Sequence, residues 1–293
     1  MSPLKRMKNS NTNFGKYKGP LPRLIIFTDL DGTLLSHDTY EPGPSLEALK
    51  LCKDLNIPVV LVSSKTRAEM ERIRDQLENR DPFVSENGGG IFVPAETWDK
   101  PEGFESSGRF WHLVRSQPHD LLSNSLDIAA RHCGALIERY SSMSLDRVME
   151  LTGLSEDETR LSQMREFDEP FLLQNQTAQI QACLERETQK KGLTLTRGGR
   201  FFHITGGYDK GKAVHHLINL YQGTHPKLLT AAVGDAVNDL PMLKEVESPF
   251  LVRKLDGRFE KDAVFDRVIV TKGTGPHGFL EAVKSMTASP DIA

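Results

Sequence analysis

The chain has 293 residues, 38% of them hydrophobic and 26% charged, which is typical of a globular protein with one large domain or two modest ones. Its formal net charge of −3 gives no reason to expect a nucleic acid or an anionic membrane as a partner. No apolar run approaches the roughly 20 residues of a membrane span.

The three cysteines, Cys52, Cys133 and Cys183, show no paired spacing, which argues against a disulfide framework or a zinc site. Unpaired cysteines favour a reducing compartment. We therefore expect a cytoplasmic monomer or homodimer that binds neither nucleic acid nor membrane.

The first 22 residues differ in composition from the rest of the chain. They carry several basic residues and no acidic one, and they lack the apolar stretch of a secretory signal. We expect residues 1–22 to form a disordered, solvated tail rather than a transit peptide.

Three short segments have the pattern of strands that are buried on both faces, because they are continuous, apolar and rich in β-branched residues. They are 24–29 (LIIFTD), 57–64 (IPVVLVSS) and 228–235 (LLTAAVGD). Apolar residues at helical spacing predict helices beside these strands, at 45–56, 66–77 and 212–221.

This alternation of strands and helices predicts an α/β fold with a doubly wound, mostly parallel sheet. Two later strands, at 249–254 and 266–272, and a helix at 276–286 would complete it. The sheet domain would then comprise residues 23–94 and 206–293.

Residues 95–205 have a different texture, which predicts a second, α+β domain inserted into the first. Ser155 and Glu158 form a capping-box pattern, which favours a helix start. Two β-rich arms flank the sequence Arg197-Gly198-Gly199-Arg200 and predict a hairpin at 193–205. The other expected elements of the insert are helices near 119–132, 155–166 and 177–190 and a strand at 169–174.

Reactive side chains follow each of the first three predicted strands. They are Asp29 and Asp31 after the first, Ser63, Ser64 and Lys65 at the second, and Asp235, Asn238 and Asp239 after the third. Because ligands of open α/β sheets bind outside the carboxyl ends of the strands, we expect these side chains to meet at one edge.

Four carboxylates gathered at one edge would repel one another unless a cation offsets them. An all-oxygen ligand set without histidine or cysteine suits Mg²⁺ better than zinc. Serine hydroxyls, helix amides and a lysine nearby could hold phosphate oxygens, so a phosphoryl group is the ligand that fits the set.

A carboxylate at the rigid end of a strand can attack phosphorus and form an aspartyl-phosphate. The second aspartate, two residues on, could protonate the leaving oxygen and then deprotonate water. Gly32 permits the tight turn that the chain must make after these residues.

The segment DLDGTL at 29–34 resembles the first motif of the haloacid dehalogenase superfamily of phosphatases. The region of Ser63 resembles its second motif, DKGKAV at 209–214 its lysine motif, and GDAVNDLPML at 234–243 its fourth, in the family order. The resemblance implies a haloacid dehalogenase-like core and identifies the insert as a C2-type cap that closes over the substrate.

By the same resemblance, Asp29 is the nucleophile and Asp31 the general acid and base. Mg²⁺ is held by Asp29, Asp31 through its backbone carbonyl, and Asp235, with Asp239 in support. Ser63 and Lys210 are the implied phosphate ligands.

A narrower resemblance is carried by five segments: TDLDGTLL at 28–35, Thr39-Tyr40, VSSKTRAE at 62–69, PFVSENGGGI at 82–91 and GGYDKGKA at 206–213. They are similar to the mannosyl-3-phosphoglycerate phosphatase family, which implies hydrolysis of a phosphorylated sugar-glycerate to mannosylglycerate and phosphate. The alternatives are glucosyl-3-phosphoglycerate, a simple sugar phosphate, or a non-catalytic phosphosugar-binding protein.

Several assignments stay open at this point. Ser64 competes with Ser63 and Lys212 with Lys210, and Asp235 and Asp239 could simply cap a helix. Lys65 and Asn238 are possible substrate ligands, and Glu86, Asn87 and Gly88 either line the substrate site or form a hairpin turn. Three cationic side chains of the predicted hairpin could bind the glycerate carboxylate or be merely exposed or packed: Arg197, Arg200 and His203.

Overall fold

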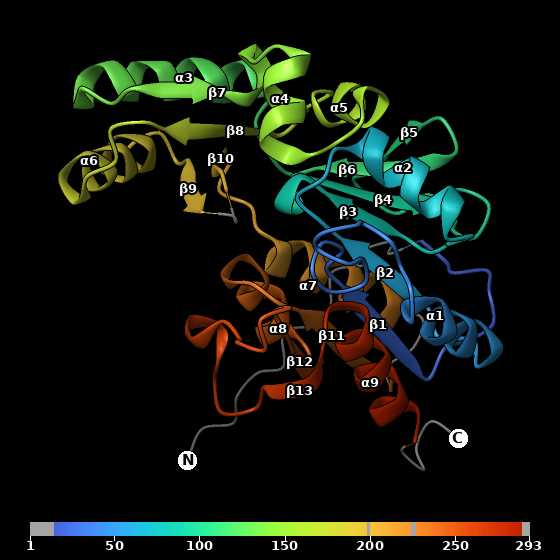
Figure 1. The fold of residues 1–293 in the computed structure, drawn as a ribbon. Coiled ribbons are helices and arrows are strands. Elements are labelled where there is room, and N and C mark those ends of the chain that lie inside the picture. The colour runs from blue at the N-terminus through green and yellow to red at the C-terminus, as the bar shows by residue number, and fades with distance from the viewer. Residues whose placement is uncertain (1–14, 198–199, 224–226, 289–293) are drawn as a thin grey trace, which may run out of the picture.

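The computed structural model describes residues 15–197, 200–223 and 227–288. Figure 1 shows a large layered core with a smaller domain above one side of it. Within the described residues, the core contains a nine-stranded sheet in the order β13-β12-β11-β1-β2-β3-β4-β6-β5. Its strands are β1 (Leu24–Thr28), β2 (Val59–Val62), β3 (Phe83–Ser85), β4 (Gly90–Pro94), β5 (Glu105–Ser107), β6 (Phe110–Val114), β11 (Leu229–Gly234), β12 (Ser248–Arg253) and β13 (Ile269–Thr274).

The stretch from β13 to β3 is parallel, which confirms the predicted doubly wound sheet. Strand β1 lies in its middle, between β11 and β2. Leu24 and Ile26 pack into the hydrophobic cluster on one face of the sheet, whereas Ile25 and Phe27 pack into the cluster on the other. This two-sided burial explains why β1 is continuously apolar rather than alternating.

Helices cover both faces of the sheet. Three of them, α1 (Ser45–Asp54), α2 (Arg67–Gln76) and α9 (Gly275–Thr287), supply buried side chains to one cluster. The other cluster receives side chains from α7 (Lys210–Gln222) and α8 (Leu240–Glu245). The predicted helices are therefore present, with ends that differ by a few residues. No helix in the described part of the chain is long and apolar enough to cross a membrane.

The sheet continues beyond β3 in antiparallel fashion through β4, β6 and β5. Strands β5 and β6 fall within 95–205, yet they pair with the core sheet rather than with the insert. The pairing of β6 with β4 therefore extends the first part of the core to Val114, about twenty residues beyond the core–cap boundary expected at residue 95. The reason is that β5 and β6 form a hairpin on β4, and sequence composition does not reveal which sheet a hairpin joins.

The smaller domain, called the cap here, has an antiparallel sheet of order β7-β8-β10-β9 in its described part. Its strands are β7 (Ile137–Arg139), β8 (Asp168–Leu173), β9 (Thr194–Arg197) and β10 (Phe202–Thr205), and its helices are α3 (His119–Cys133), α4 (Leu145–Thr152), α5 (Glu156–Ser162) and α6 (Ala178–Gln189). The predicted capping box of Ser155 and Glu158 begins α5. The hairpin arms are present as β9 and β10, while Gly198 and Gly199 lie outside the described residues.

The expectation of unpaired cysteines is wrong. Cys133 at the end of α3 and Cys183 in α6 form a disulfide, with Cα atoms 5.8 Å apart. The two residues are 50 positions apart in sequence, and only the packing of α3 beside α6 brings them together. Cys52 is a buried free thiol in α1. The cysteines therefore no longer argue for a reducing compartment.

Part of the expected N-terminal tail is ordered. Lys18 donates its backbone N–H to Thr97 O, and Asp99 donates to Lys16 O, so residues 16–18 pair with the segment before β5. The ring of Tyr17 packs against those of Trp98 and Tyr221, with centroid distances of 5.1 and 5.4 Å, and these two rings also contact each other. Residues 16–18 therefore pack on the core, because Tyr17 contacts two aromatic side chains there; the basic composition of the segment does not indicate this. Residues 1–14 lie outside the described part.

We expect the Cys183→Ser variant to lose roughly 4 kcal/mol of unfolding free energy, because the bridge closes a loop of 50 residues. Urea unfolding followed by circular dichroism measures this loss. The wild type in dithiothreitol should fall to the stability of the variant, and Cys52→Ala should stay sensitive to reductant. A wild type whose free energy of unfolding is the same with and without dithiothreitol would contradict the disulfide.

Candidate active site

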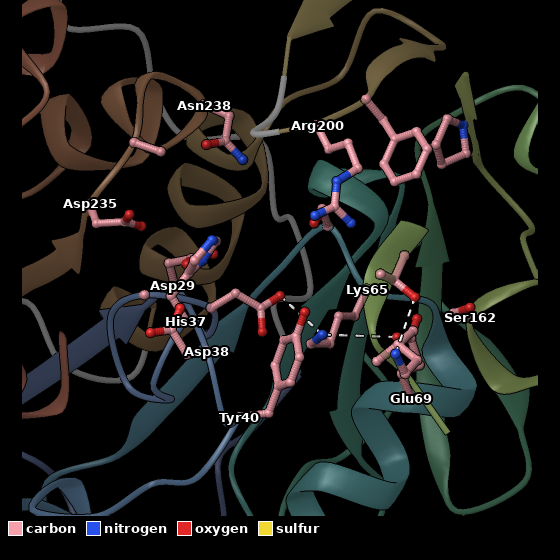
Figure 2. A pocket seen from close by; sticks show the side chains of 18 of the residues that line it. Asp29, His37, Asp38, Tyr40, Lys65, Glu69, Ser162, Arg200, Asp235 and Asn238 are labelled. Carbon is pink, nitrogen blue, oxygen red and sulfur yellow. Dashed lines mark hydrogen bonds and ion pairs between the residues drawn. The ribbon is translucent and has the colours of Figure 1, made fainter. Parts of the chain in front are cut away.

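The three strand ends singled out in the sequence meet at one edge of the core sheet, as expected from their parallel pairing. Asp29 follows β1, Asp235 follows β11, and Ser64 and Lys65 follow β2. Together with side chains of the cap they line a cavity of about 1080 Å³. Figure 2 shows Asp29 and Asp235 on one side of this space and Lys65 on the other.

Lys210 lies beneath the floor of the cavity. Asp209 caps α7 by accepting the N–H of Lys212, which places Lys210 in the first turn, at the sheet edge. Its ammonium donates to Asp29 Oδ1 and to Asp239 Oδ1, both at 2.6 Å, and the residue is only 1% exposed. Burial alone would lower the pKa of Lys210, but the carboxylates of Asp239 and Asp29 raise it, so the group stays charged.

Asp239 organises the loop that carries Asp235. Its Oδ2 accepts the backbone N–H groups of Asp235 and Ala236, each at 3.0 Å, while its Oδ1 accepts from Lys210. Gly32 lies against the same loop with φ +84°, and a Cβ there would sit 2.9 Å from Asp235 Oδ2. The glycine is therefore needed both for the left-handed turn and for the close approach of the two loops.

The carboxylates of Asp29, Asp235 and Asp239 offer oxygen atoms that all lie within 4.8 Å of one another. Burial raises the pKa of Asp29 to about 7, because Lys210 only partly opposes it and the charges of Asp239 and Asp31 add to it. Burial also raises the pKa of Asp235 well above its usual range, with further contributions from Asp239 and Asp29. Such a cluster favours either protons or a cation.

The residues fit a hard divalent cation. All the candidate donors are oxygens, and Asp31 Oδ1 is buried without a hydrogen-bond partner among the described residues. Carboxylate oxygens gathered as in Asp29, Asp235 and Asp239 suit an oxygen-preferring ion such as Mg²⁺, and the unsatisfied oxygen belongs to Asp31, whose charge acts on Asp29. Asp239 is less suited to coordination than Asp29 or Asp235, since both of its oxygens already accept hydrogen bonds.

Asp31 lies at the mouth of the site and pairs with Lys65. The Lys65 ammonium is 3.0 Å from Asp31 Oδ2 and 3.9 Å from Glu69 Oε1, and it stands 5.0 Å from the centre of the Tyr40 ring. Burial would lower the pKa of Lys65, but Asp31 and Glu69 raise it above its usual value. Lys65 thus presents a fixed positive charge beside the carboxylate of Asp31.

The two candidate serines differ in position. Ser63 is 1% exposed, and its Oγ accepts the backbone N–H of Lys65 at 3.2 Å, whereas Ser64 lines the cavity. The Ser64 carbonyl accepts from the guanidinium of Arg165 in the cap at 2.7 Å. The arrangement leaves Ser63 at the strand end behind the cavity wall and Ser64 on its surface.

Glu86, Asn87 and Gly88 lie where the core meets the cap, outside the lining of the cavity. Glu86 accepts the backbone N–H groups of Glu166 and Phe167, and Asn87 donates to Asp168 Oδ2 at 3.3 Å. Burial raises the pKa of Glu86 to about 7. Asn238 does line the cavity and donates to Asn87 Oδ1 at 3.4 Å. Glu86 and Asn87 therefore join the two domains, while Gly88 lies against the backbone of Asp209 in the core. All three form η1 (Glu86–Gly88), the turn between β3 and β4.

Other residues of the cavity wall were not singled out from the sequence. The cap contributes Tyr140, Ser162 and Arg165, and the loop after β1 contributes His37 and Asp38. Arg165 is buried, with its Nε on Ser162 O at 3.0 Å and its guanidinium 5.6 Å from the Tyr140 ring. No sequence motif identifies these residues, because the cap residues reach the cavity only through the packing of the cap on the core. Tyr40 also lines the cavity, and it belongs to the Thr39-Tyr40 segment of the narrower family resemblance.

The chain matches the family model described as haloacid dehalogenase-like hydrolase over residues 26–101 and 153–263. It is 37% identical over 266 residues to a glucosyl-3-phosphoglycerate/mannosyl-3-phosphoglycerate phosphatase of Methanococcoides burtonii, covering 89% of this chain and 96% of that protein. It is 31% identical to a protein of the same name from Persephonella marina, with the same two coverages. A mannosyl-3-phosphoglycerate phosphatase of Pyrococcus furiosus is 30% identical over 79% of this chain and 91% of its own.

Solved structures show the same fold at lower identity. A Thermoplasma acidophilum protein has a TM-score of 0.61 at 17% identity, covering 93% of this chain and 100% of its own. The sucrose-phosphatase of Synechocystis, solved with sucrose and phosphate, has a TM-score of 0.59 at 15% identity, covering 90% of this chain and 98% of its own. By its matched motifs, its relatives and its fold, the chain belongs to the haloacid dehalogenase-like hydrolase family.

Proposed function

We propose that this phosphatase is Mg²⁺-dependent and hydrolyses mannosyl-3-phosphoglycerate to mannosylglycerate and phosphate through an aspartyl-phosphate. The observation that carries the proposal is the convergence of Asp29, Asp31 and Asp235 above the buried Lys210. The names of the relatives at 30–37% identity support the substrate. Two of them also name glucosyl-3-phosphoglycerate, which makes that compound the second candidate.

Asp29 is the proposed nucleophile because its strand end is rigid. The Lys210 ammonium donates to Asp29 Oδ1, and the backbone N–H of Asp29 donates to Val233 O at 3.0 Å, so the carboxylate is held in place. A fixed carboxylate oxygen can approach phosphorus in line with the departing ester oxygen. Attack forms the Asp29–phosphorus bond and breaks the bond between phosphorus and the ester oxygen.

Asp31 is the proposed proton carrier. In its protonated form it gives a proton to the departing alkoxide, and it then takes a proton from the water that attacks the aspartyl-phosphate. That attack releases inorganic phosphate and restores the Asp29 carboxylate. Asp31 suits this role better than Asp29 because its side chain is 29% exposed and faces the cavity, where a leaving group and a water can reach it.

Mg²⁺ would be held by Asp29, Asp235 and the Asp31 region, with Asp239 as the support of the loop, and it would supply positive charge to the phosphoryl oxygens. Lys210 opposes the rise in the pKa of Asp29 and so favours the ionised form that attacks. Ser63 or Ser64, together with the N–H groups that begin α2, is the proposed phosphate cradle, since α2 begins at Arg67, three residues after Ser64.

The proposed location is the cytoplasm, and its support is the charge of the substrate. A metabolite with a phosphate and a carboxylate does not cross a bilayer unaided, because burying its charges is costly. The proposed partner is therefore a small phosphorylated sugar-glycerate, with a monomer or homodimer as the working unit.

The purified protein with Mg²⁺ should release phosphate from mannosyl-3-phosphoglycerate faster than from simple sugar phosphates, with glucosyl-3-phosphoglycerate as the nearest competitor. Asp29→Asn should lower kcat by on the order of 10⁴-fold, because no other group can form the phosphoenzyme. A malachite-green phosphate assay measures both. Appreciable turnover by Asp29→Asn would rule out the aspartyl-phosphate route, whereas activity confined to simple sugar phosphates would remove only the substrate.

Mg²⁺ should stabilise the folded protein by about 2.7 kcal/mol at a hundred times its dissociation constant, measured as a rise in Tm. Asp235→Asn should abolish this rise, yet be no less stable than the wild type in EDTA, because it removes a buried like charge.

Burial raises the pKa of Asp29 from 3.8 to about 7, so metal-free stability should fall as pH rises from about 4 to 7. The Mg²⁺ effect should grow over the same range, since protons and the cation compete. An Mg²⁺-induced rise in Tm that is as large in Asp235→Asn as in the wild type would contradict the proposed metal site.

Lys210→Met should lose about 3–5 kcal/mol of stability, because it leaves two buried carboxylates without their counter-charge. Turnover should fall with it, by on the order of 10²-fold or more. Lys212→Met is the matched control. Lys212 is exposed, and its ammonium donates to Gly207 O and forms an exposed ion pair with Asp209 at 3.9 Å, so the variant's stability should stay within about 0.5 kcal/mol of the wild type's. Urea unfolding and the phosphate assay together distinguish the two lysines, and the reverse pattern would overturn the assignment.

A further inference from the structure

We propose that Arg200, in the cap, binds a carboxylate of the substrate and makes the enzyme selective for phosphomonoesters that carry a second anionic group. The inference rests on the proposed function in one respect, namely that the phosphate sits at Asp29. It extends that function by assigning the selectivity to one side chain of the cap hairpin.

Arg200 lines the cavity from the cap. It lies just before β10, and Phe201 and His203 of the same segment line the cavity with it. Figure 2 shows its guanidinium reaching from the cap toward Lys65 and Tyr40 of the core. Burial raises the pKa of Tyr40, as does Asp31, while Lys65 and Arg200 oppose the rise, so the Arg200 charge is felt at the Tyr40 hydroxyl.

The cavity wall is rich in acidic side chains. Asp29 and Asp235 suit a cation and the phosphate that binds with it, and four further acids line the same wall: Asp31, Asp38, Glu69 and Asp256. A second anionic group of the substrate would be repelled there and must find positive charge elsewhere. The cavity wall offers four cations for this purpose: Lys65, Arg165, Arg200 and Lys254.

Three of these cations are already engaged. Lys65 pairs with Asp31 at 3.0 Å, and Lys254 pairs with Glu260 at 3.0 Å. Arg165 donates to Ser64 O and Ser162 O and lies 3.8 Å from Asp168. Arg200 makes no ion pair with any residue in the described part of the chain. Its guanidinium, with five donors in a planar fork, is suited to bidentate binding of a carboxylate.

The other two cationic residues of the hairpin do not compete for this role. Arg197 is exposed on β9, lies 5.3 Å from the Phe202 ring and is absent from the cavity wall. His203 lines the cavity, but its Nδ1 is 2.8 Å from the buried Asp168 carboxylate. Of the three hairpin residues that the sequence suggested for a carboxylate, Arg200 is therefore the one placed to bind it.

This assignment makes the substrate a link between the two domains. The core would hold the phosphate, and the cap would hold the carboxylate through Arg200. Binding energy from the carboxylate could then favour the closed arrangement in which the phosphate is attacked, so its loss should appear in kcat/KM.

The test compares matched substrates that differ only in the carboxylate. One pair is mannosyl-3-phosphoglycerate and its analogue with CH₂OH in place of the carboxylate; the second pair is 3-phosphoglycerate and glycerol 3-phosphate. Arg200→Gln should lower kcat/KM roughly 10- to 100-fold for the carboxylate member and change the alcohol member by no more than about twofold. Arg200→Lys should fall between, because it keeps the charge without the fork. Arg197→Gln is the control from the same hairpin.

A selective loss in Arg200→Gln, with Arg197→Gln unchanged, supports the inference. Equal effects on both members of each pair, or a wild type that does not prefer the carboxylate members, would overturn it while leaving phosphatase activity intact. If mannosyl-3-phosphoglycerate is not hydrolysed but the second pair shows the Arg200-dependent preference, the proposed substrate fails and the inference stands. Unchanged Tm values in both variants show that folding is not the cause.

Discussion

The contact between Lys210 and the two aspartates Asp29 and Asp239 is the interaction on which the site depends. One buried ammonium joins the end of β1 to the loop after β11, and each bond is 2.6 Å long. Because Asp239 also accepts two backbone N–H groups of the loop that carries Asp235, the same contact sets the position of a proposed metal ligand. A buried charge trio of this kind is stable only when every member is present.

The cap is positioned by polar contacts rather than by a shared hydrophobic core. Glu86 and Asn87 of the core bind the start of β8 and the residues before it, and Arg165 of the cap returns a bond to Ser64. Hydrophobic clusters belong to one domain or the other with few exceptions, of which Phe167 is one. Interfaces held in this way permit relative motion between the two domains.

The core sheet and the meeting of Asp29 and Asp235 at its edge were predictable from sequence, because buried parallel strands are continuously apolar and these two residues directly follow two of them. Long-range pairing was not predictable. Cys133 and Cys183 meet only because α3 packs beside α6, Tyr17 becomes ordered only against Trp98 and Tyr221, and β5 and β6 join the core sheet through β4. The hairpin's three cationic residues looked equivalent in sequence, and only the fold distinguishes Arg200 from Arg197 and His203.

The disulfide lies wholly within the cap, between two of its helices, and within the described residues the core has no counterpart. Oxidation state therefore acts on one module of the enzyme and not on the other. A cell that reduced this bridge would loosen the cap, which carries Arg200, while Asp29 and Lys210 of the core stayed in place. If Arg200 selects the substrate as proposed, redox conditions would alter which esters are chosen more than how fast a bound ester is cleaved.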